Sequence, residues 1–73
     1  MNIKRLEAAK KHYEALYASA EVTIEVYLTN AAGIGEHPQI MEELRKQIEI
    51  LTDAKDQIST IEELISKYQL SKN

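Results

Sequence analysis

Two long stretches with the same spacing of apolar residues, separated by a short glycine-containing segment, constrain the fold of this chain most strongly. In residues 2–32 and again in residues 38–68, apolar side chains recur at steps of three and four, which places them on one face of a helix. The first stretch carries Leu6, Ala9, Tyr13, Leu16, Ala20, Ile24, Tyr27 and Ala31. The second carries Met41, Leu44, Ile48, Leu51, Ile58, Ile61, Ile65 and Tyr68, and Lys55 interrupts the set. The spacing predicts two amphipathic helices.

Two segments of these stretches allow a second interpretation. Residues 21–28 alternate β-branched with polar residues, which is a strand pattern, but the chain offers no second strand to pair with it and we favour a helix. Residues 52–57 are polar, and Ser59 to Glu62 match a capping box, so a kink near 52–59 is the alternative to one continuous helix, which we favour. Asn2 is the expected cap of the first helix.

The segment between the two stretches holds both glycines and the only proline of the chain. Gly33 suits the left-handed position that follows a helix, and Pro38 suits the first position of the next one. We therefore expect a helix over 2–32, a turn over 33–37, a helix over 38–68 and a frayed tail over 69–73. A turn this short makes the two helices antiparallel, so the expected fold is an all-α helical hairpin.

The same turn has a functional interpretation as well. Backbone N–H groups at a glycine-rich turn before a helix can bind a small anionic ligand, although the carboxylates near this turn would repel one. The candidate partner- or ligand-binding residues are Asn30, Gly33, Gly35, Glu36, His37, Tyr13 and Tyr17. The two tyrosines either pack between helices or stack on a base, in which case Lys10, Lys11 and Arg45 are the candidate phosphate contacts. Both interpretations stay open.

The length of the chain argues for self-association. A chain of 73 residues without cysteine has no disulfide to add to a small hydrophobic core. A hairpin also leaves part of each helix uncovered, and Val22, Val26 and Ile50 fall outside the two apolar stripes. We therefore expect a homo-oligomer, most simply a dimer of hairpins that forms a four-helix bundle. Each rod should be basic at its termini and acidic at its turn.

Composition and motifs exclude several functions. The net charge of −3 and the mixed signs along the chain argue against binding to a nucleic acid polymer or an anionic membrane. No apolar run is long enough to span a membrane, and the charged residues 1–11 do not resemble a signal peptide, so we expect a cytoplasmic protein. The two histidines lack metal-site spacing and no nucleophile motif is present, so we expect no metal, no cofactor and no enzymatic activity.

One combination of motifs carries a resemblance. The run YLTN at 27–30, the sequence GIGEHP at 33–38 and the segment AKD at 54–56 of a long amphipathic helix resemble a group of small uncharacterised proteins encoded by tailed bacteriophages. The resemblance implies a helical hairpin of phage origin in the bacterial host cell, without an assigned activity. The expected function is a phage accessory protein that binds a host or phage protein. The alternatives are an oligomeric sponge for a nucleotide-like host signal and a structural protein of virion assembly.

Overall fold

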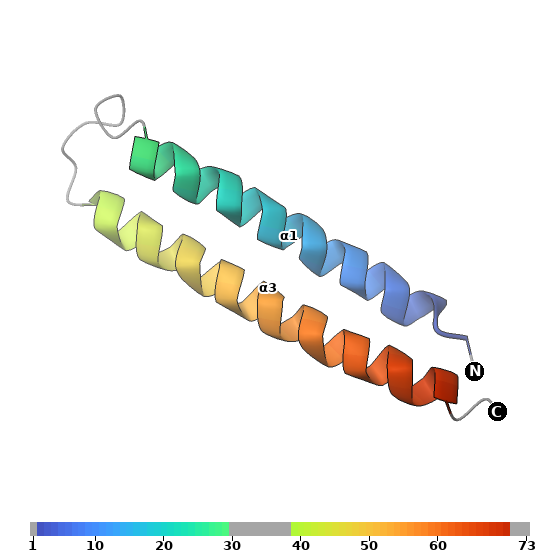
Figure 1. Cartoon of the computed structure of the whole chain (residues 1–73). Helices are drawn as coiled ribbons and strands as arrows, with labels where there is room; N and C mark the ends of the chain where they lie inside the picture. The colour runs from blue at the N-terminus through green and yellow to red at the C-terminus, as the bar shows by residue number, and fades with distance from the viewer. Residues whose placement is uncertain (1, 30–38, 71–73) are drawn as a thin grey trace.

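The protein folds into two helices that lie side by side and run in opposite directions (Figure 1). The computed structural model describes residues 2–29 and 39–70, in which helix α1 covers Lys4–Thr29 and helix α3 covers Gln39–Leu70. These described residues contain no strand, and they form a rod of 57 × 14 × 14 Å. The predicted all-α helical hairpin is confirmed. α3 continues two residues past its expected end at Tyr68.

The start of α1 follows from the side chain of Asn2. The backbone N–H of Lys4 donates a hydrogen bond of 2.9 Å to Oδ1 of Asn2, and the N–H of Glu7 donates one of 2.9 Å to the carbonyl of Ile3. Asn2 therefore satisfies one of the N–H groups that a helix start leaves without a partner in the helix. The predicted cap is confirmed, and the cap position explains why α1 begins at Lys4 rather than at residue 2.

The segment with the strand pattern, residues 21–28, is helical throughout. The polar β-branched residue of this segment, Thr23, has a hydrogen-bond partner within the helix. Its Oγ1 donates a hydrogen bond of 3.0 Å to the carbonyl of Ser19 one turn earlier. Thr29 does the same at the end of the helix, where its Oγ1 lies 2.7 Å from the carbonyl of Glu25. The helix preferred from the sequence is correct. α3 likewise runs without a break through residues 52–59.

The two helices meet along a seam whose residues are spaced alternately by three and four. In the α1 segment the seam comprises Ile3, Leu6, Lys10, Tyr13, Tyr17, Ala20, Ile24 and Tyr27, all buried or half-buried. In α3 it comprises Ile40, Leu44, Gln47, Leu51, Ala54, Ile58, Ile61, Ile65 and Tyr68, again all buried or half-buried. A strict repeat of seven residues is the pattern of a coiled coil. The hairpin is therefore organised as an antiparallel coiled coil.

This seam differs from the predicted apolar stripe of α3. Met41 and Ile48, which were expected to face α1, are 63% and 46% exposed. Gln47 and Ala54 occupy the seam instead, so Lys55 does not interrupt the contact between the helices. Both rows repeat every seven residues, but the row through Ala54 continues with Ile61 and Tyr68, whereas the row through Lys55 continues with Glu62. Only the row through Ala54 keeps charged side chains of α3 out of the helix contact.

In α1 the corresponding change occurs at two places, because the seam contains Lys10 rather than the predicted Ala9, and Tyr17 rather than Leu16. Tyr17 lies half-buried in the seam, whereas Leu16, which the spacing had placed on the buried face, is exposed beside it. The seam here follows the same seven-residue repeat, which continues from Tyr17 to Ile24. Leu16 therefore remains available on the surface of the isolated hairpin.

The core of the hairpin is small. Among residues 2–29 and 39–70, only Ala20, Ala54 and Ile61 are buried, with exposed fractions of 2%, 1% and 6%. Eight large apolar residues are exposed in the same part of the chain, and they include the predicted off-stripe residues Val22, Val26 and Ile50. A single hairpin thus leaves much of its apolar surface in contact with water.

Candidate functional site

The predicted residues of the glycine-containing turn lie in a part of the chain that the structure does not describe. Asn30, Gly33, Gly35, Glu36 and His37 all fall within residues 30–38, outside the described ranges. Their role as a partner- or ligand-binding site therefore stays a prediction. The site residues that can be located in the structure are the two tyrosines of α1.

Tyr13 and Tyr17 both lie half-buried in the seam between the helices. The ring of Tyr13 also contacts His12 edge to face, with 5.3 Å between ring centroids and an interplanar angle of 76°. Packing between helices is thus the role that the described residues give to these tyrosines. Tyr17 has a second environment, because its ring also forms one wall of a groove.

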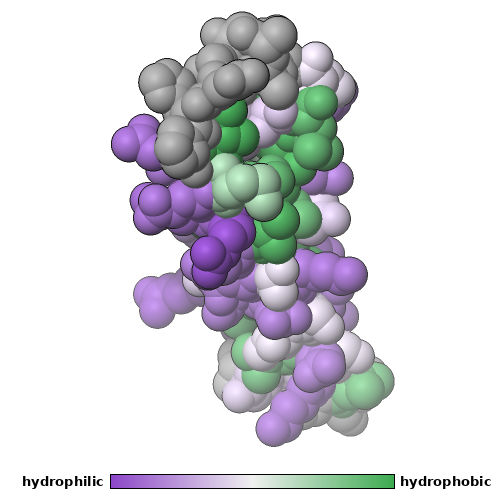
Figure 2. Space-filling view, turned by 90° about the vertical axis from the view of Figure 1, so that its left-hand side faces the viewer, coloured by the Kyte–Doolittle hydropathy of each residue, from purple (hydrophilic) through white to green (hydrophobic). Residues whose placement is uncertain are grey.

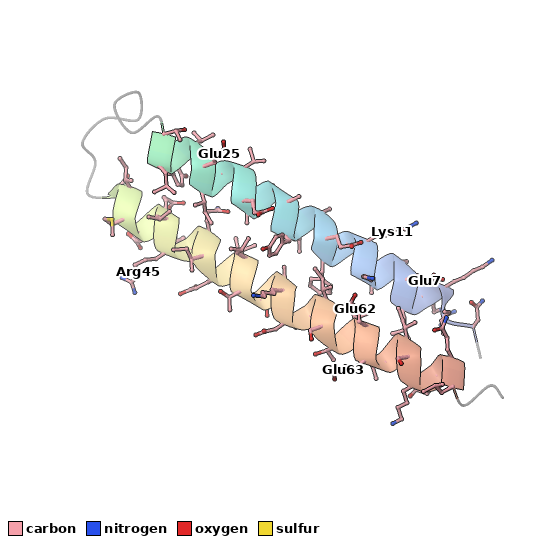
Figure 3. All side chains as sticks on the ribbon, in the orientation of Figure 1. Glu7, Lys11, Glu25, Arg45, Glu62 and Glu63 are labelled. Carbon is pink, nitrogen blue, oxygen red and sulfur yellow. The ribbon has the colours of Figure 1, made fainter. Side chains whose placement is uncertain are left out.

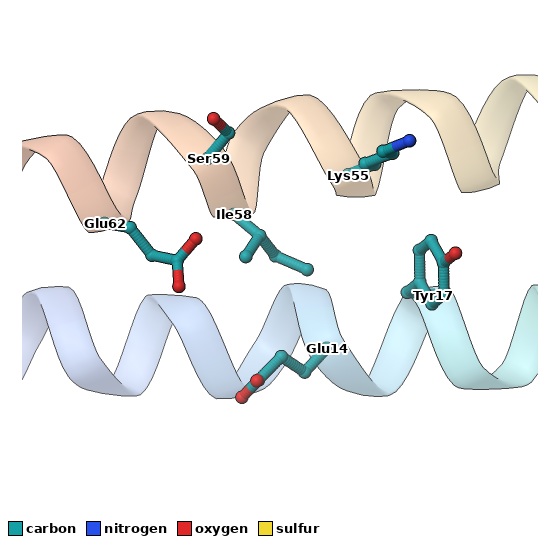
Figure 4. Close-up of a pocket in the computed structure, with 6 residues that line it drawn as sticks. All are labelled: Glu14, Tyr17, Lys55, Ile58, Ser59 and Glu62. Atoms are coloured by element: carbon teal, nitrogen blue, oxygen red, sulfur yellow. The ribbon is translucent and has the colours of Figure 1, made fainter.

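This central groove opens on one side of the hairpin, has a volume of about 470 Å³, and is shown in Figure 4. It is lined by Glu14 and Tyr17 from α1 and by Lys55, Ile58, Ser59 and Glu62 from α3. In Figure 4, Ile58 and Glu62 point toward α1 and the ring of Tyr17 points toward α3. The groove therefore has an apolar floor with charged groups around it.

The charges of the central groove disfavour an anionic ligand. Two carboxylates, those of Glu14 and Glu62, line it together with the single cation Lys55. Nζ of Lys10 lies 3.2 Å from Oε2 of Glu62, so this second cation already has an ionic partner. A phosphate in the groove would meet like charges, which weakens binding.

The three candidate phosphate contacts do not meet within one hairpin. Lys10 and Lys11 lie in the first half of α1, whereas Arg45 lies in the first half of α3, at the other end of the rod (Figure 3). The side chains of Lys11 and Arg45 also point away from each other in this view. A single copy of the chain thus does not gather these cations into one phosphate site.

The two ends of the hairpin differ in charge. The open end holds the start of α1 and the end of α3, and the closed end holds the end of α1 and the start of α3 (Figure 1). In the described part of the chain, the open half (4–16 and 55–70) has six basic and five acidic residues. The closed half (17–29 and 39–54) has two basic and six acidic residues. The expected acidic end is present. The expected basic end is nearly neutral, because carboxylates such as Glu7, Glu62 and Glu63 lie in the same half (Figure 3).

The closed half also carries an exposed apolar surface. A second groove, with a volume of about 530 Å³, is lined there by Val22, Ile24, Leu28 and Leu51, and the carboxylate-bearing Glu21 and Glu25 also line it. Figure 2, which looks at the hairpin from the side of its closed end, shows hydrophobic side chains gathered in this region. We call the exposed residues Val22, Leu28, Met41 and Ile48 the closed-end patch.

The sequence pattern alone did not identify the residues of the central groove. Glu14 belongs to no motif, and Ser59 and Glu62 were singled out only as the ends of a capping box. The three side chains come together only because the helices are antiparallel and in this register. One signal was present, since Lys55 interrupted the predicted stripe of α3. A charged residue at the margin of a helix contact is a common place for an interhelical ion pair, and this could have drawn attention to the groove.

Two kinds of site can be assessed directly in the described part of the chain. Residues 2–29 and 39–70 hold no group of three or more His, Cys, Asp or Glu side chains that could bind a metal ion. Neither α1 nor α3 has the length and apolarity that a membrane crossing requires.

Comparison of the chain with protein-family models, with curated proteins and with solved structures gives no match. The fold is that of a small antiparallel helical hairpin, and its surfaces are the evidence for its function.

The ion pair between Lys10 and Glu62 should contribute only modestly to stability. The two side chains are 31% and 56% exposed, so solvent screens their attraction, and we expect a coupling free energy of about 0.5 kcal/mol. The measurement is a double-mutant cycle of thermal unfolding with Lys10→Glu, Glu62→Lys and the swapped double variant. The double variant should recover most of the stability lost in the single variants. Strictly additive losses would show that the pair is not coupled.

Proposed function

We propose that this chain is a small non-enzymatic accessory protein that acts by holding another protein at its closed end. The observation that carries the proposal is the closed-end patch beside an apolar groove, in a hairpin whose described helices bury only three residues. Grouped apolar residues rimmed by polar ones typically mark protein interaction sites. The resemblance of the GIGEHP sequence and its flanking segments to small phage proteins supports the proposal that this protein is encoded by a bacteriophage and acts inside the bacterial host cell.

The chemistry of this surface indicates the kind of partner. An apolar helix face can fill the groove formed by Ile24, Leu28 and Leu51, since an amphipathic helix commonly binds in a groove between two other helices. Glu21 and Glu25 beside the groove would attract basic residues at the margins of that face. The partner we propose is therefore a host or phage protein that presents an amphipathic helix flanked by lysine or arginine.

Self-association is part of the same proposal. The exposed apolar residues are more than one hairpin can cover, and a second copy of the chain would cover a share of them. We propose a dimer of hairpins that forms a four-helix bundle, which is a common way for two such units to complete a core. The dimer leaves room for a separate partner at each closed end.

The nucleotide sponge and the virion protein receive less support. A nucleotide needs cations near its phosphates, but the central groove is lined by more carboxylates than cations and Arg45 lies far along the rod from Lys11. A virion role predicts no particular surface chemistry, so nothing in the described helices favours it over the binding of another protein.

Site-specific photo-crosslinking in bacterial cells tests the proposed function. A photoreactive residue is placed at Thr29, which lines the apolar groove of the closed half. In a matched control it is placed at Gln69, which is exposed near the open end. The expected result is a defined protein crosslinked from position 29 and not from position 69. Adding Met41→Glu to the first variant should abolish that product, because a carboxylate would then lie in the apolar patch.

Two outcomes would contradict the proposal. Identical crosslinked products from positions 29 and 69 would show that the closed end has no special role. A small molecule retained in the native mass spectrum of the purified protein, together with no crosslinked protein, would instead favour the nucleotide sponge.

A further inference from the structure

One side of the hairpin carries a continuous row of residues without charge. This row, which we call the neutral strip, consists of Ala9, Leu16, Thr23, Ile50, Gln57 and Leu64. In each helix these residues are seven apart and stand next to the seam on the same side of it, so they follow the whole middle of the rod. The strip contains three large aliphatic side chains.

The opposite side of the seam is different. There the corresponding positions of α1 carry Glu7, Glu14 and Glu21, and those of the open half of α3 include Lys55 and Glu62. The central groove opens on that side, and three of these charged residues, Glu14, Lys55 and Glu62, line it. Long apolar contact between copies of the chain is thus possible on one side only.

Burial supports the same distinction. Ala9, Thr23, Gln57 and Leu64 are half-buried in the single hairpin, while Leu16 and Ile50 beside them are just exposed. An apolar stripe that includes the seam and one flanking row is wider than a two-helix contact needs, and it is the pattern of helices that pack in a larger bundle.

We propose that the neutral strip is the surface on which a second copy of this chain docks, with the two hairpins antiparallel. This inference rests on the self-association proposed above and names its surface and orientation. The strip follows about 21 Å of each helix at 1.5 Å per residue. A whole side of the rod of 57 × 14 × 14 Å offers roughly 800 Å², which is what each partner contributes to a standard interface. The second copy therefore docks with the strip at the centre of the interface and covers the rest of that side of the rod as well.

The contacts across the strip decide the orientation. If the hairpins are antiparallel, a two-fold axis crosses the middle of the strip. This axis places Leu16 of one hairpin against Leu16 of the other, and Ile50 of each hairpin against Leu64 of the other. If the hairpins are parallel, α1 of each copy lies over α3 of the second copy, and Leu16 contacts Gln57. The antiparallel arrangement thus pairs aliphatic side chains with one another.

The charges of the two halves favour the same orientation. In the described part of the chain, the closed half has six acidic and two basic residues, whereas the open half has five acidic and six basic residues. Antiparallel hairpins place the acidic half of one copy over the nearly neutral half of the other. Parallel hairpins would bring the two acidic halves together, which is less favourable.

The experiment compares two isoleucines of α3 by native mass spectrometry and analytical ultracentrifugation. Ile50 lies on the neutral strip and is 40% exposed, and Ile48 lies on the opposite side of the seam with similar exposure. We expect the unmodified protein and Ile48→Glu to be dimers, and Ile50→Glu to be a monomer at the same concentration. Circular dichroism checks that each variant remains helical.

Different failures identify different errors. A monomeric unmodified protein would overturn the proposed self-association itself. A dimer that persists in Ile50→Glu but is lost in Ile48→Glu would keep the self-association and overturn the choice of surface.

A cysteine crosslink tests the orientation without a disruptive charge. The chain has no cysteine, so a thiol introduced as Leu16→Cys is the only one present. Under mild oxidation it should form a disulfide with the same residue of the second copy, whereas Ala15→Cys, on the outer face of α1, should not. Failure of Leu16→Cys to crosslink, together with crosslinking between separate Leu16→Cys and Gln57→Cys chains, would show parallel hairpins.

Discussion

Replacing Ala20 by glutamate is expected to abolish the folded hairpin. Ala20 is buried where α1 contacts α3, and its methyl group leaves no space for a longer side chain. A carboxylate there would be buried without a cation, a change that costs on the order of 3 kcal/mol or more. A core in a chain of this size rarely supplies more than about 3–5 kcal/mol, so the loss is comparable with the entire stability. Circular dichroism at 222 nm should show loss of helix at 25 °C.

Ala15→Glu is the matched control for this change. Ala15 lies in the same helix but is exposed, so glutamate there should lower the midpoint of thermal unfolding by a few degrees at most. If Ala20→Glu unfolded at the same temperature as Ala15→Glu, the contact between the helices would have to run along another face of α1.

Shortening Ile61 to alanine should give the second largest loss. Ile61 is the largest of the three buried residues, and its neighbours in the seam are only half-buried. Removing its branched side chain creates a cavity and exposes apolar surface, which costs about 2–4 kcal/mol in comparable cores. For a domain of this length we expect the midpoint of thermal unfolding to fall by roughly 10–20 °C.

The control for Ile61→Ala is Leu70→Ala, at the last residue of α3. Leu70 is among the most exposed apolar residues of the described helices, so its truncation should change the midpoint very little. Equal losses in the two variants would mean that Leu70 is covered in solution, for example by another copy of the chain. A small effect of Ile61→Ala would place the main stabilising contacts elsewhere along the seam.

The two proposed surfaces lie on different sides of the seam and can be occupied at once. The neutral strip runs along the middle of one side, whereas Leu28, Met41 and Ile48 of the closed-end patch lie at one end of the other. A dimer with antiparallel hairpins would therefore present one patch at each end of the bundle. Such an arrangement could bind two partner molecules at once, which raises the apparent affinity for a partner that is itself paired.

The sequence was sufficient to predict the helices, because their determinants are local. A spacing of three and four and a capping side chain at Asn2 depend only on neighbouring residues. The same local information predicted that Val22, Val26 and Ile50 would stay outside the helix contact. It also predicted that α3 would be continuous through residues 52–59.

The tertiary structure decided which row of each helix faces the other. Two rows of α3 differ by a single residue, one through Ile48 and Lys55 and one through Gln47 and Ala54. In the first half of the helix the isoleucine at 48, beside a glutamine at 47, favoured the wrong row. Both rows repeat every seven residues, so the spacing does not separate them, and only the packing of the two whole helices selects the row in which Ala54 and Ile61 are buried. The same packing brings Lys10 to Glu62 and Tyr17 to the central groove. These pairs are far apart in the sequence, and no local pattern specifies the register that joins them.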